Sequence, residues 1–91
     1  MSDHLTAQLK ITNQRGLHAR ASAKFVNLVE AFDAKIQVTR EGETVDGASI
    51  MGLMMLGASL GMTIEVAASG AQAEQALAAI SDLVERKFDE E

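Results

Sequence analysis

The chain contains four short segments in which apolar and polar residues alternate, and this pattern limits its fold more than any other feature. Apolar side chains occupy the odd positions of residues 5–11, as expected for a strand that is buried on one side. Similar patterns predict strands over residues 35–40, 43–46 and 63–68. Because each strand has one polar side, only one face of the resulting sheet can be covered.

Apolar residues at helical spacing lie between and after these strands. They predict a helix over about residues 19–31 and a final helix whose apolar face spans residues 73–88. A shorter helix is expected to open at residues 47–49 and to close at residues 57–61. The element order is β-α-β-β-α-β-α. We therefore predict one α+β domain over residues 1–91, an open-faced two-layer sandwich with all helices on one face of the sheet.

Composition excludes several classes of protein. No cysteine is present, which rules out disulfides and thiolate metal sites. The net charge of −5, from 8 Lys and Arg against 13 Asp and Glu, argues against a nucleic-acid partner. No apolar run approaches the roughly 20 residues of a membrane span. Met1–His4 lack the layout of a secretion signal, so we expect a cytoplasmic protein without a membrane partner.

The segment Gly16-Leu17-His18-Ala19-Arg20 is the strongest functional signal in the chain. Gly16 gives the backbone freedom just before His18, which lies where a helix is expected to begin. The N–H groups of Ala19 and Arg20 would have no helical acceptor and would favour an anion. A neutral imidazole here can carry a phosphoryl group, and Arg20 can bind its oxygens. The simpler interpretation is a surface histidine that at most caps the helix.

Charges around this segment are positive. Arg15, Arg20 and Lys24 lie near it, and residues 4–29 contain no acidic side chain. The tail of residues 89–91 is acidic. We therefore expect a locally positive site within an acidic protein, suited to an anionic ligand or an acidic partner. Lys24 is expected to be a solvated charge.

With these residues the chain resembles the HPr family, the histidine phosphocarriers of the bacterial phosphoenolpyruvate-dependent phosphotransferase system. Residues 16–20 match the family's active-site motif. Residues 49–56, Ser-Ile-Met-Gly-Leu-Met-Met-Leu, resemble its second-helix signature. The resemblance covers essentially the whole chain. It implies a four-stranded antiparallel sheet in the order 1-4-2-3, with three helices on one side.

The same resemblance implies a function. His18 would accept a phosphoryl group on Nδ1 from enzyme I, itself charged by phosphoenolpyruvate, and an EIIA-type protein would then take it. Arg20 matches the family's active-site arginine. This chain has Ala21 where the family usually has proline. Because proline presets the first turn of a helix, we expect an effect on the rate and no loss of activity. The hydroxyl of Ser22 could bond exposed backbone.

Ser49 has two interpretations. A serine hydroxyl suits the N-cap of the second helix. Ser49 also matches the regulatory serine of many relatives, which would make a serine kinase/phosphorylase a further partner. A phosphate there would add roughly −1.5 to −2 charges. Ala48 precedes it where many relatives carry lysine, which argues against recognition by that kinase.

The second helix is too apolar for all its side chains to face inward. We expect Leu53 and either Leu56 or Gly57 to face the sheet, and Ile50, Met51 and Met54 to form an exposed patch. Methionine-rich surfaces adapt to several partners, and the family docks its partners through this helix. Loose core packing is the alternative interpretation.

Other functions stay open at this point. A regulatory domain of this fold could dock proteins without carrying phosphate, although it would be expected to lack His18. A small acidic adaptor could bind a metabolite phosphate instead.

The sequence contains no paired catalytic carboxylates, Ser-His-Asp set, nucleotide loop or metal cluster. We therefore expect a carrier rather than a free-standing enzyme, with no cofactor or metal. We assign His4 no role and expect a monomer. Residues 49–56 resemble the same segment in family members of the nitrogen or regulatory phosphotransferase branch more than in dedicated sugar carriers.

Overall fold

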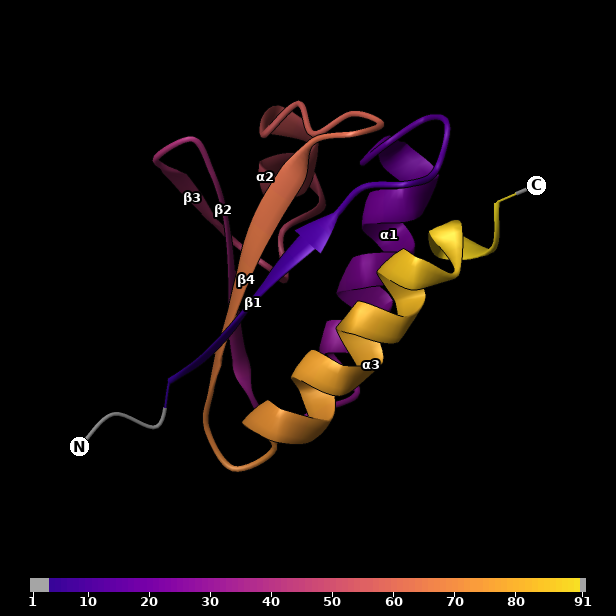
Figure 1. Cartoon of the computed structure of the whole chain (residues 1–91). Helices are drawn as coiled ribbons and strands as arrows, with labels where there is room; N and C mark the ends of the chain where they lie inside the picture. Colours follow the sequence, from indigo (N-terminus) through magenta and orange to yellow (C-terminus); the bar gives the residue numbers. More distant parts are fainter. Residues whose placement is uncertain (1–3, 91) are drawn as a thin grey trace.

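Residues 4–90 form four strands, β1 (Leu5–Lys10), β2 (Lys35–Arg40), β3 (Glu43–Asp46) and β4 (Thr63–Ser69). They make one antiparallel sheet in the order β1-β4-β2-β3 (Figure 1). This order confirms the one implied by the family resemblance. The structure is a computed structural model that describes residues 4–90. Residues 1–3 and 91, which belong to the N-terminal segment and the acidic tail considered above, lie outside the described residues.

The register of the strands gathers their apolar side chains on one face. Leu9 pairs with Ile64 across β1 and β4, and Val38 pairs with Val66 across β2 and β4. Ile64, Val38 and Val66 are fully buried, whereas Gln37, which alternates with Val38, is exposed. The sheet therefore has one covered face, as the alternating pattern predicts.

Three helices pack on this face, α1 (Ala19–Val29), α2 (Ile50–Met55) and α3 (Ala73–Glu85). α1 and α3 lie side by side, while α2 contacts α1 and β3 (Figure 1). Phe25, Leu53 and Ile80, one from each helix, are fully buried in the core that they share with the sheet. The predicted open-faced two-layer sandwich is confirmed. Within residues 4–90, no helix is both long and apolar enough to cross a membrane.

Two elements end before the apolar pattern does. Ile11 is fully buried but follows β1, because its backbone bonds to Met62 in a loop rather than to a strand. α1 ends at Val29, and Ala31 and Phe32 form turns that bond three residues back. The spacing of apolar residues predicts which side chains are buried. Buried residues continue past the last hydrogen bond of the helix or strand, so this spacing does not predict where an element ends.

The last helix also ends early, and a left-handed turn follows it as the short helix η1 (Lys87–Asp89). Its three residues have φ angles of 58°, 56° and 58°, a region that residues with a Cβ rarely adopt. Phe88 is only 2% exposed, so the apolar pattern predicts its burial but not its conformation. The guanidinium of Arg86 binds both carboxylate oxygens of Asp89 at 2.7 and 2.8 Å. Burial and this ion pair hold the turn.

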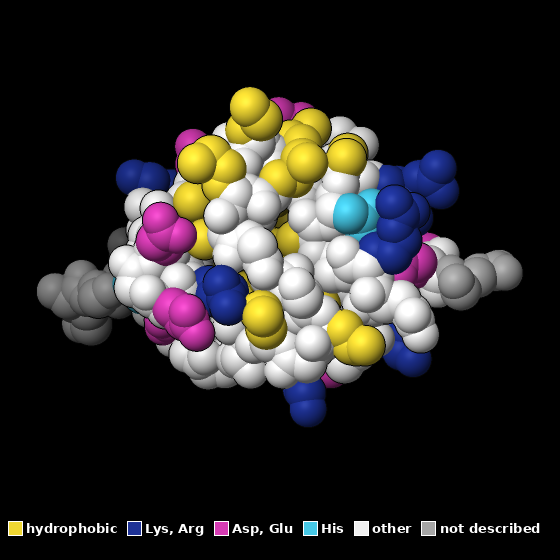
Figure 2. Space-filling model, turned by 90° about the horizontal axis from the view of Figure 1, so that it is seen from above, with side chains coloured by type: hydrophobic (Ala, Val, Ile, Leu, Met, Phe, Trp, Pro, Cys, Tyr) yellow, Lys and Arg dark blue, Asp and Glu magenta, His cyan; other side chains and the backbone are white. Residues whose placement is uncertain are grey.

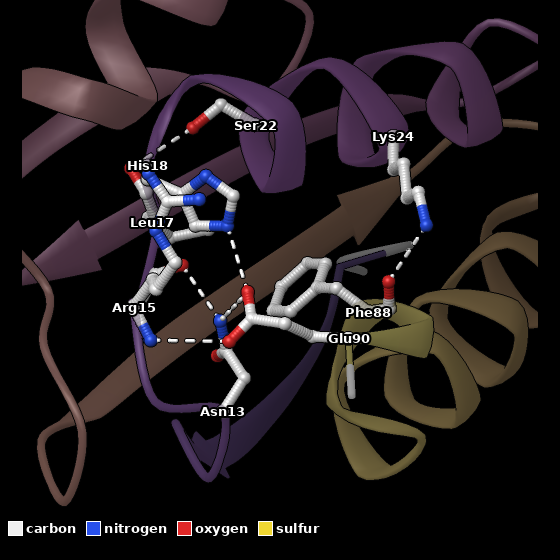
Figure 3. Close-up of polar contacts among 9 residues, drawn as sticks. Asn13, Arg15, Leu17, His18, Ser22, Lys24, Phe88 and Glu90 are labelled. Carbon is white, nitrogen blue, oxygen red and sulfur yellow. Dashed lines mark hydrogen bonds and ion pairs between the residues drawn. The ribbon is translucent and has the colours of Figure 1, made fainter.

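The prediction that Lys24 is a solvated charge is wrong. Its Nζ donates a hydrogen bond to the carbonyl oxygen of Phe88 at 2.8 Å, and the contact is partly buried (Figure 3). This bond ties the C-terminal turn to α1. The residue that follows the turn, Glu90, is thereby brought to the start of α1.

Candidate functional site

A loop carries the chain from β1 to the start of α1 and fixes the approach to His18. Gly16 has a φ of +62°, and a Cβ at this position would collide with the carbonyl oxygen of Ala58. The N–H of Leu17 donates to the same carbonyl at 3.0 Å. The loop is thus held against the segment that joins α2 to β4. The expectation that glycine is needed for the backbone here is confirmed.

Two buried polar side chains brace this loop. The hydroxyl of Ser22 donates to the carbonyl of Leu17 at 3.2 Å, the kind of backbone contact anticipated for it. The Nδ2 of Asn13 donates to the carbonyl of Gly16 at 2.9 Å. Asn13 is 1% exposed, and its Oδ1 has no hydrogen-bond partner within the described range 4–90.

His18 is the N-cap residue of α1. Its backbone is extended, with φ −74° and ψ −179°, and its carbonyl accepts the N–H of Ser22 at 2.9 Å. The N–H groups of Ala19, Arg20 and Ala21 therefore have no acceptor inside the helix. The imidazole makes no capping bond to them. These donors, together with the positive end of the helix dipole, favour an anion at this position.

The carboxylate of Glu90 lies against the imidazole of His18 (Figure 3). Its Oε2 is 2.8 Å from Nε2 of His18. The carboxylate also accepts the side-chain N–H of Asn13 at 3.1 Å and the backbone N–H of Arg15 at 3.2 Å. The side chains of His18 and Glu90 are 16% and 17% exposed. The ring is therefore held from one side and still reaches the surface.

Glu90 brings negative charge to the site. Partial burial raises the pKa of its carboxyl, but hydrogen bonds from His18, Asn13 and Arg15 together lower it further, so the pKa lies below the ordinary value of 4.5. The group is ionised at neutral pH. The predicted positive site therefore also contains an acidic side chain, because the fold brings together residues that lie 72 positions apart.

Arg20 follows His18 closely but does not bind its ring. It is exposed on the first turn of α1, and within the described part of the chain its guanidinium makes no hydrogen bond or ion pair. A free guanidinium can meet an added anion without breaking an existing contact. In Figure 2 a histidine reaches the surface beside basic side chains, as this arrangement requires.

Ser49 is the N-cap residue of α2. Its Oγ accepts the N–H of Gly52 at 2.9 Å, which confirms the capping interpretation of this serine. Leu53 and Leu56 are 0% and 3% exposed, as predicted for the side of α2 that faces the core. The hydroxyl of Ser49 therefore has a structural role in the cap of α2, independent of any phosphorylation.

Ile50, Met51 and Met54 are 41%, 71% and 41% exposed, so loose core packing does not describe them. Other exposed apolar side chains on α2 and in the loop before β4 extend the surface that they form. We call the following set the apolar patch: Ile50, Met51, Met54, Met55, Leu60 and Met62. Figure 2 shows hydrophobic side chains gathered on the face that also carries a histidine and basic side chains.

Two parts of this surface are not predicted from the sequence. Glu90 belongs to an acidic tail without apolar periodicity. The one sequence feature that indicates its position is Phe88, because this apolar residue is buried two positions earlier and holds the chain against the core. Leu60 and Met62 flank Gly61, where the second helix is predicted to close, and both precede the strand predicted from residue 63. Isolated apolar residues in a loop are a weak indication that the loop forms part of an exposed apolar surface.

The fold and the site together define a class of protein. It is a small two-layer sandwich in which a histidine lies at a helix N-terminus beside an apolar patch, the arrangement expected of a phosphoryl carrier. Residues 5–86 match the family described as "PTS HPr component phosphorylation site". The chain belongs to this family, the HPr phosphocarriers of the phosphotransferase system.

Relatives support this assignment along nearly the full chain. The chain is 43% identical over 86 residues to phosphocarrier protein HPr of Neisseria meningitidis, covering 94% of this chain and 97% of that protein. It is also 43% identical over 86 residues to phosphocarrier protein NPr of Shewanella violacea, covering 94% of each. The crystal structure of HPr-C-His from Thermoanaerobacter tengcongensis has a TM-score of 0.91 and 40% identity, covering 96% of this chain and 98% of that one. These likenesses indicate a phosphocarrier role rather than that of a catalyst.

Proposed function

We propose that residues 1–91 form one carrier domain in which His18 accepts a phosphoryl group on Nδ1 from phosphorylated enzyme I and passes it to an EIIA-type protein. The observation that carries this proposal is the position of His18. Its ring is partly exposed at the N-terminus of an 11-residue helix, where three backbone N–H groups have no helical acceptor. Membership in the HPr family supports the same assignment.

The transfer needs a nucleophile and a shallow cradle for the phosphoryl oxygens. The Nδ1 lone pair attacks phosphorus, the bond from phosphorus to the donor breaks, and its electron pair leaves with the donor. In onward transfer the acceptor attacks, and the electrons of the N–P bond return to Nδ1. The N–H groups of Ala19 and Arg20 and the guanidinium of Arg20 bind the oxygens, with about 1.5–3 kcal/mol for each charged hydrogen bond. A few such bonds orient the group without trapping it.

Partner docking is assigned to Ile50, Met51 and Met54, within the apolar patch. These side chains are exposed on a helix that contacts α1, so a partner seated there is close to His18. Donor and acceptor must use the same surface in turn, and methionine side chains adapt to both. This shared, transient use fits a monomer in the cytoplasm.

Phosphorylation of Ser49 by a serine kinase/phosphorylase would regulate the carrier. A phosphate at the N-cap of α2 would place roughly −1.5 to −2 charges beside Ile50, at the edge of the apolar patch. The expected consequence is weaker docking of enzyme I. Ala48, in place of the lysine of many relatives, argues against efficient recognition by the kinase.

Two relatives named phosphocarrier protein NPr, from Shewanella violacea and Escherichia coli, support an acceptor in the nitrogen or regulatory branch, alongside others named HPr. Titration of the phosphorylated protein against candidate EIIA proteins tests this.

The alternative function is a non-catalytic docking domain that uses the apolar patch but not His18. The position of His18 at a helix N-terminus favours the carrier.

The test is incubation with enzyme I and radiolabelled phosphoenolpyruvate. Acid-labile label is expected on the protein and is expected to vanish in His18→Ala. His4→Ala is the matched control, because His4 is the other of the 2 histidines, and this variant is expected to keep the label. Absence of label on the unmodified protein, or label retained in His18→Ala, would contradict the proposal.

A further inference from the structure

We propose that Glu90 is a positioning residue for His18, whose carboxylate holds the imidazole in the tautomer with its proton on Nε2 and so leaves the Nδ1 lone pair free. The consequence for phosphoryl transfer rests on the proposed function. The tautomer itself can be measured independently of any transfer.

The contact between the two side chains determines where the ring proton lies. An ionised carboxylate can only accept hydrogen bonds, so the 2.8 Å contact of Glu90 with Nε2 requires a proton on that nitrogen. A neutral imidazole has one N–H, and the hydrogen bond made by one nitrogen sets the state of the other. Within the described residues, the ring of His18 has no further hydrogen bond. Nδ1 therefore carries the free lone pair.

Glu90 is held where it can do this. The amide of Asn13 and the backbone N–H of Arg15 bind one oxygen each, at 3.1 and 3.2 Å. Two residues earlier, Phe88 is 2% exposed, and its carbonyl accepts a bond from Lys24. Glu90 is thus anchored by its own bonds to the loop before α1, and by the contacts of nearby Phe88 with α1 and the core. Such support fixes the orientation of the ring in addition to its tautomer.

The same carboxylate faces the charge that the transfer creates. When Nδ1 forms its bond to phosphorus, the Nε2 proton stays, and the ring becomes a phosphorylated imidazolium with one positive charge. The electron pair of the broken bond leaves with the donor, so no proton has to move. Glu90 stabilises this charge from the Nε2 side. It does not occupy the position at Nδ1 where the phosphoryl group is bound.

A blocking role for the C-terminal segment leads to the opposite expectation. If Glu90 covered the site and repelled the donor, its removal would speed phosphorylation. The contact at Nε2 instead of Nδ1, and the 16% exposure that the His18 side chain retains, favour positioning.

The tautomer is tested by nitrogen NMR of histidine-labelled protein at about pH 8.5, where an ordinary imidazole is neutral. The unmodified protein is expected to show one protonated nitrogen, Nε2, and one unprotonated nitrogen, Nδ1. In Glu90→Ala both signals are expected to move toward the values of a ring that exchanges between tautomers. Identical spectra for the two proteins would overturn the proposal.

Kinetics with enzyme I test the consequence. Glu90→Ala is expected to lower kcat for phosphorylation about tenfold, at the low end for loss of a group that orients a functional histidine, with KM unchanged. Glu90→Gln keeps an acceptor oxygen without the charge, so it should restore the tautomer and part of kcat. Glu85→Gln removes the same charge from an exposed position on α3 and should change neither. A faster Glu90→Ala variant would establish blocking instead.

These measurements separate two failures. If the unmodified protein accepts no phosphoryl group, the proposed function fails, and the NMR comparison still decides whether Glu90 orients the ring. If the protein is phosphorylated but Glu90→Ala leaves both tautomer and kcat unchanged, only the role of Glu90 is refuted. Circular dichroism of each variant checks that the fold is retained.

Discussion

Gly16 fixes the path of the backbone that presents His18. Its φ of +62° costs a residue with a Cβ roughly 1–2 kcal/mol, and a Cβ would also collide with the carbonyl of Ala58. We expect Gly16→Ala to lower the free energy of unfolding by more than about 2 kcal/mol, because strain and overlap add. Urea denaturation measures the loss.

Gly42→Ala is the matched control for this change. Gly42 has a φ of +85° but no atom near the position that its Cβ would take. Only the backbone strain should appear, about 1 kcal/mol. Equal losses in the two variants would show that the contact with Ala58 contributes nothing.

The pH dependence of stability tests the environment of Glu90. The pKa of its carboxyl is lowered from 4.5 in the folded protein. A lowered pKa stabilises the fold above the unfolded-state value of about 4.5, and this contribution is lost as the pH falls through the folded-state pKa. We therefore expect Glu90→Gln to melt at a lower temperature than the unmodified protein at neutral pH, and the two melting temperatures to converge once the pH falls below the folded-state pKa.

Melting followed by circular dichroism at several pH values provides this comparison. Glu85→Gln, which removes a carboxylate exposed on α3, should track the unmodified protein throughout. A difference between Glu90→Gln and the unmodified protein that persists unchanged at acidic pH would mean that Glu90 acts through packing and not through its charge.

At the scale of single elements, α2 depends on its cap. It has only 6 residues, and the Oγ of Ser49 accepts one of its first N–H groups. Ser49→Ala should destabilise the protein by about 1 kcal/mol through loss of that bond, measured by urea denaturation. Ser49→Asp keeps a capping oxygen and should retain most of the stability while it weakens enzyme I binding through its charge. A Ser49→Ala variant as stable as the original would refute the capping role.

The elements themselves are largely predictable from the sequence, but their ends are not. The alternation around Ile64 and Val66 and the helical spacing around Phe25 and Ile80 specify strands and helices because one side of each element is buried. Phe88 continues the apolar face of α3 in the sequence, yet it lies in a left-handed turn. Local propensity disfavours that turn, and burial of Phe88 with the Arg86–Asp89 pair overrides it. Such tertiary contacts are not encoded in periodicity.

At the scale of the whole molecule, the site is predictable only in the part that is local in sequence. His18, Arg20 and the first N–H groups of α1 follow from five consecutive residues, because the start of a helix leaves these N–H groups without helical acceptors. Glu90 reaches His18 through the packing of α1 against α3 and through the turn after α3. No local pattern relates residues that lie 72 positions apart, so the charge of the finished site differs from the charge of the segment.

The apolar patch provides a test at this largest scale. The side chain of Met51 is 71% exposed, so little packing is lost on its replacement. Met51→Asp should leave the melting temperature nearly unchanged and weaken enzyme I binding at least about tenfold, or 1.4 kcal/mol, because a charge would be buried in the interface. Calorimetric titration measures this affinity. A large fall in melting temperature would show that the side chain of Met51 contributes to stability and would contradict a role in docking alone.

Two further variants distinguish docking from a general effect of charge. Ala71→Asp adds the same charge at an exposed position in the turn between β4 and α3, at the other end of the sheet from α2 (Figure 1). Because the proposed transfer brings the partner and the phosphoryl group together at His18, this distant charge should leave enzyme I affinity intact. Met51→Leu keeps an apolar side chain and should bind nearly as well as the original. If Ala71→Asp weakened binding as much as Met51→Asp, net charge and not the patch would govern the encounter.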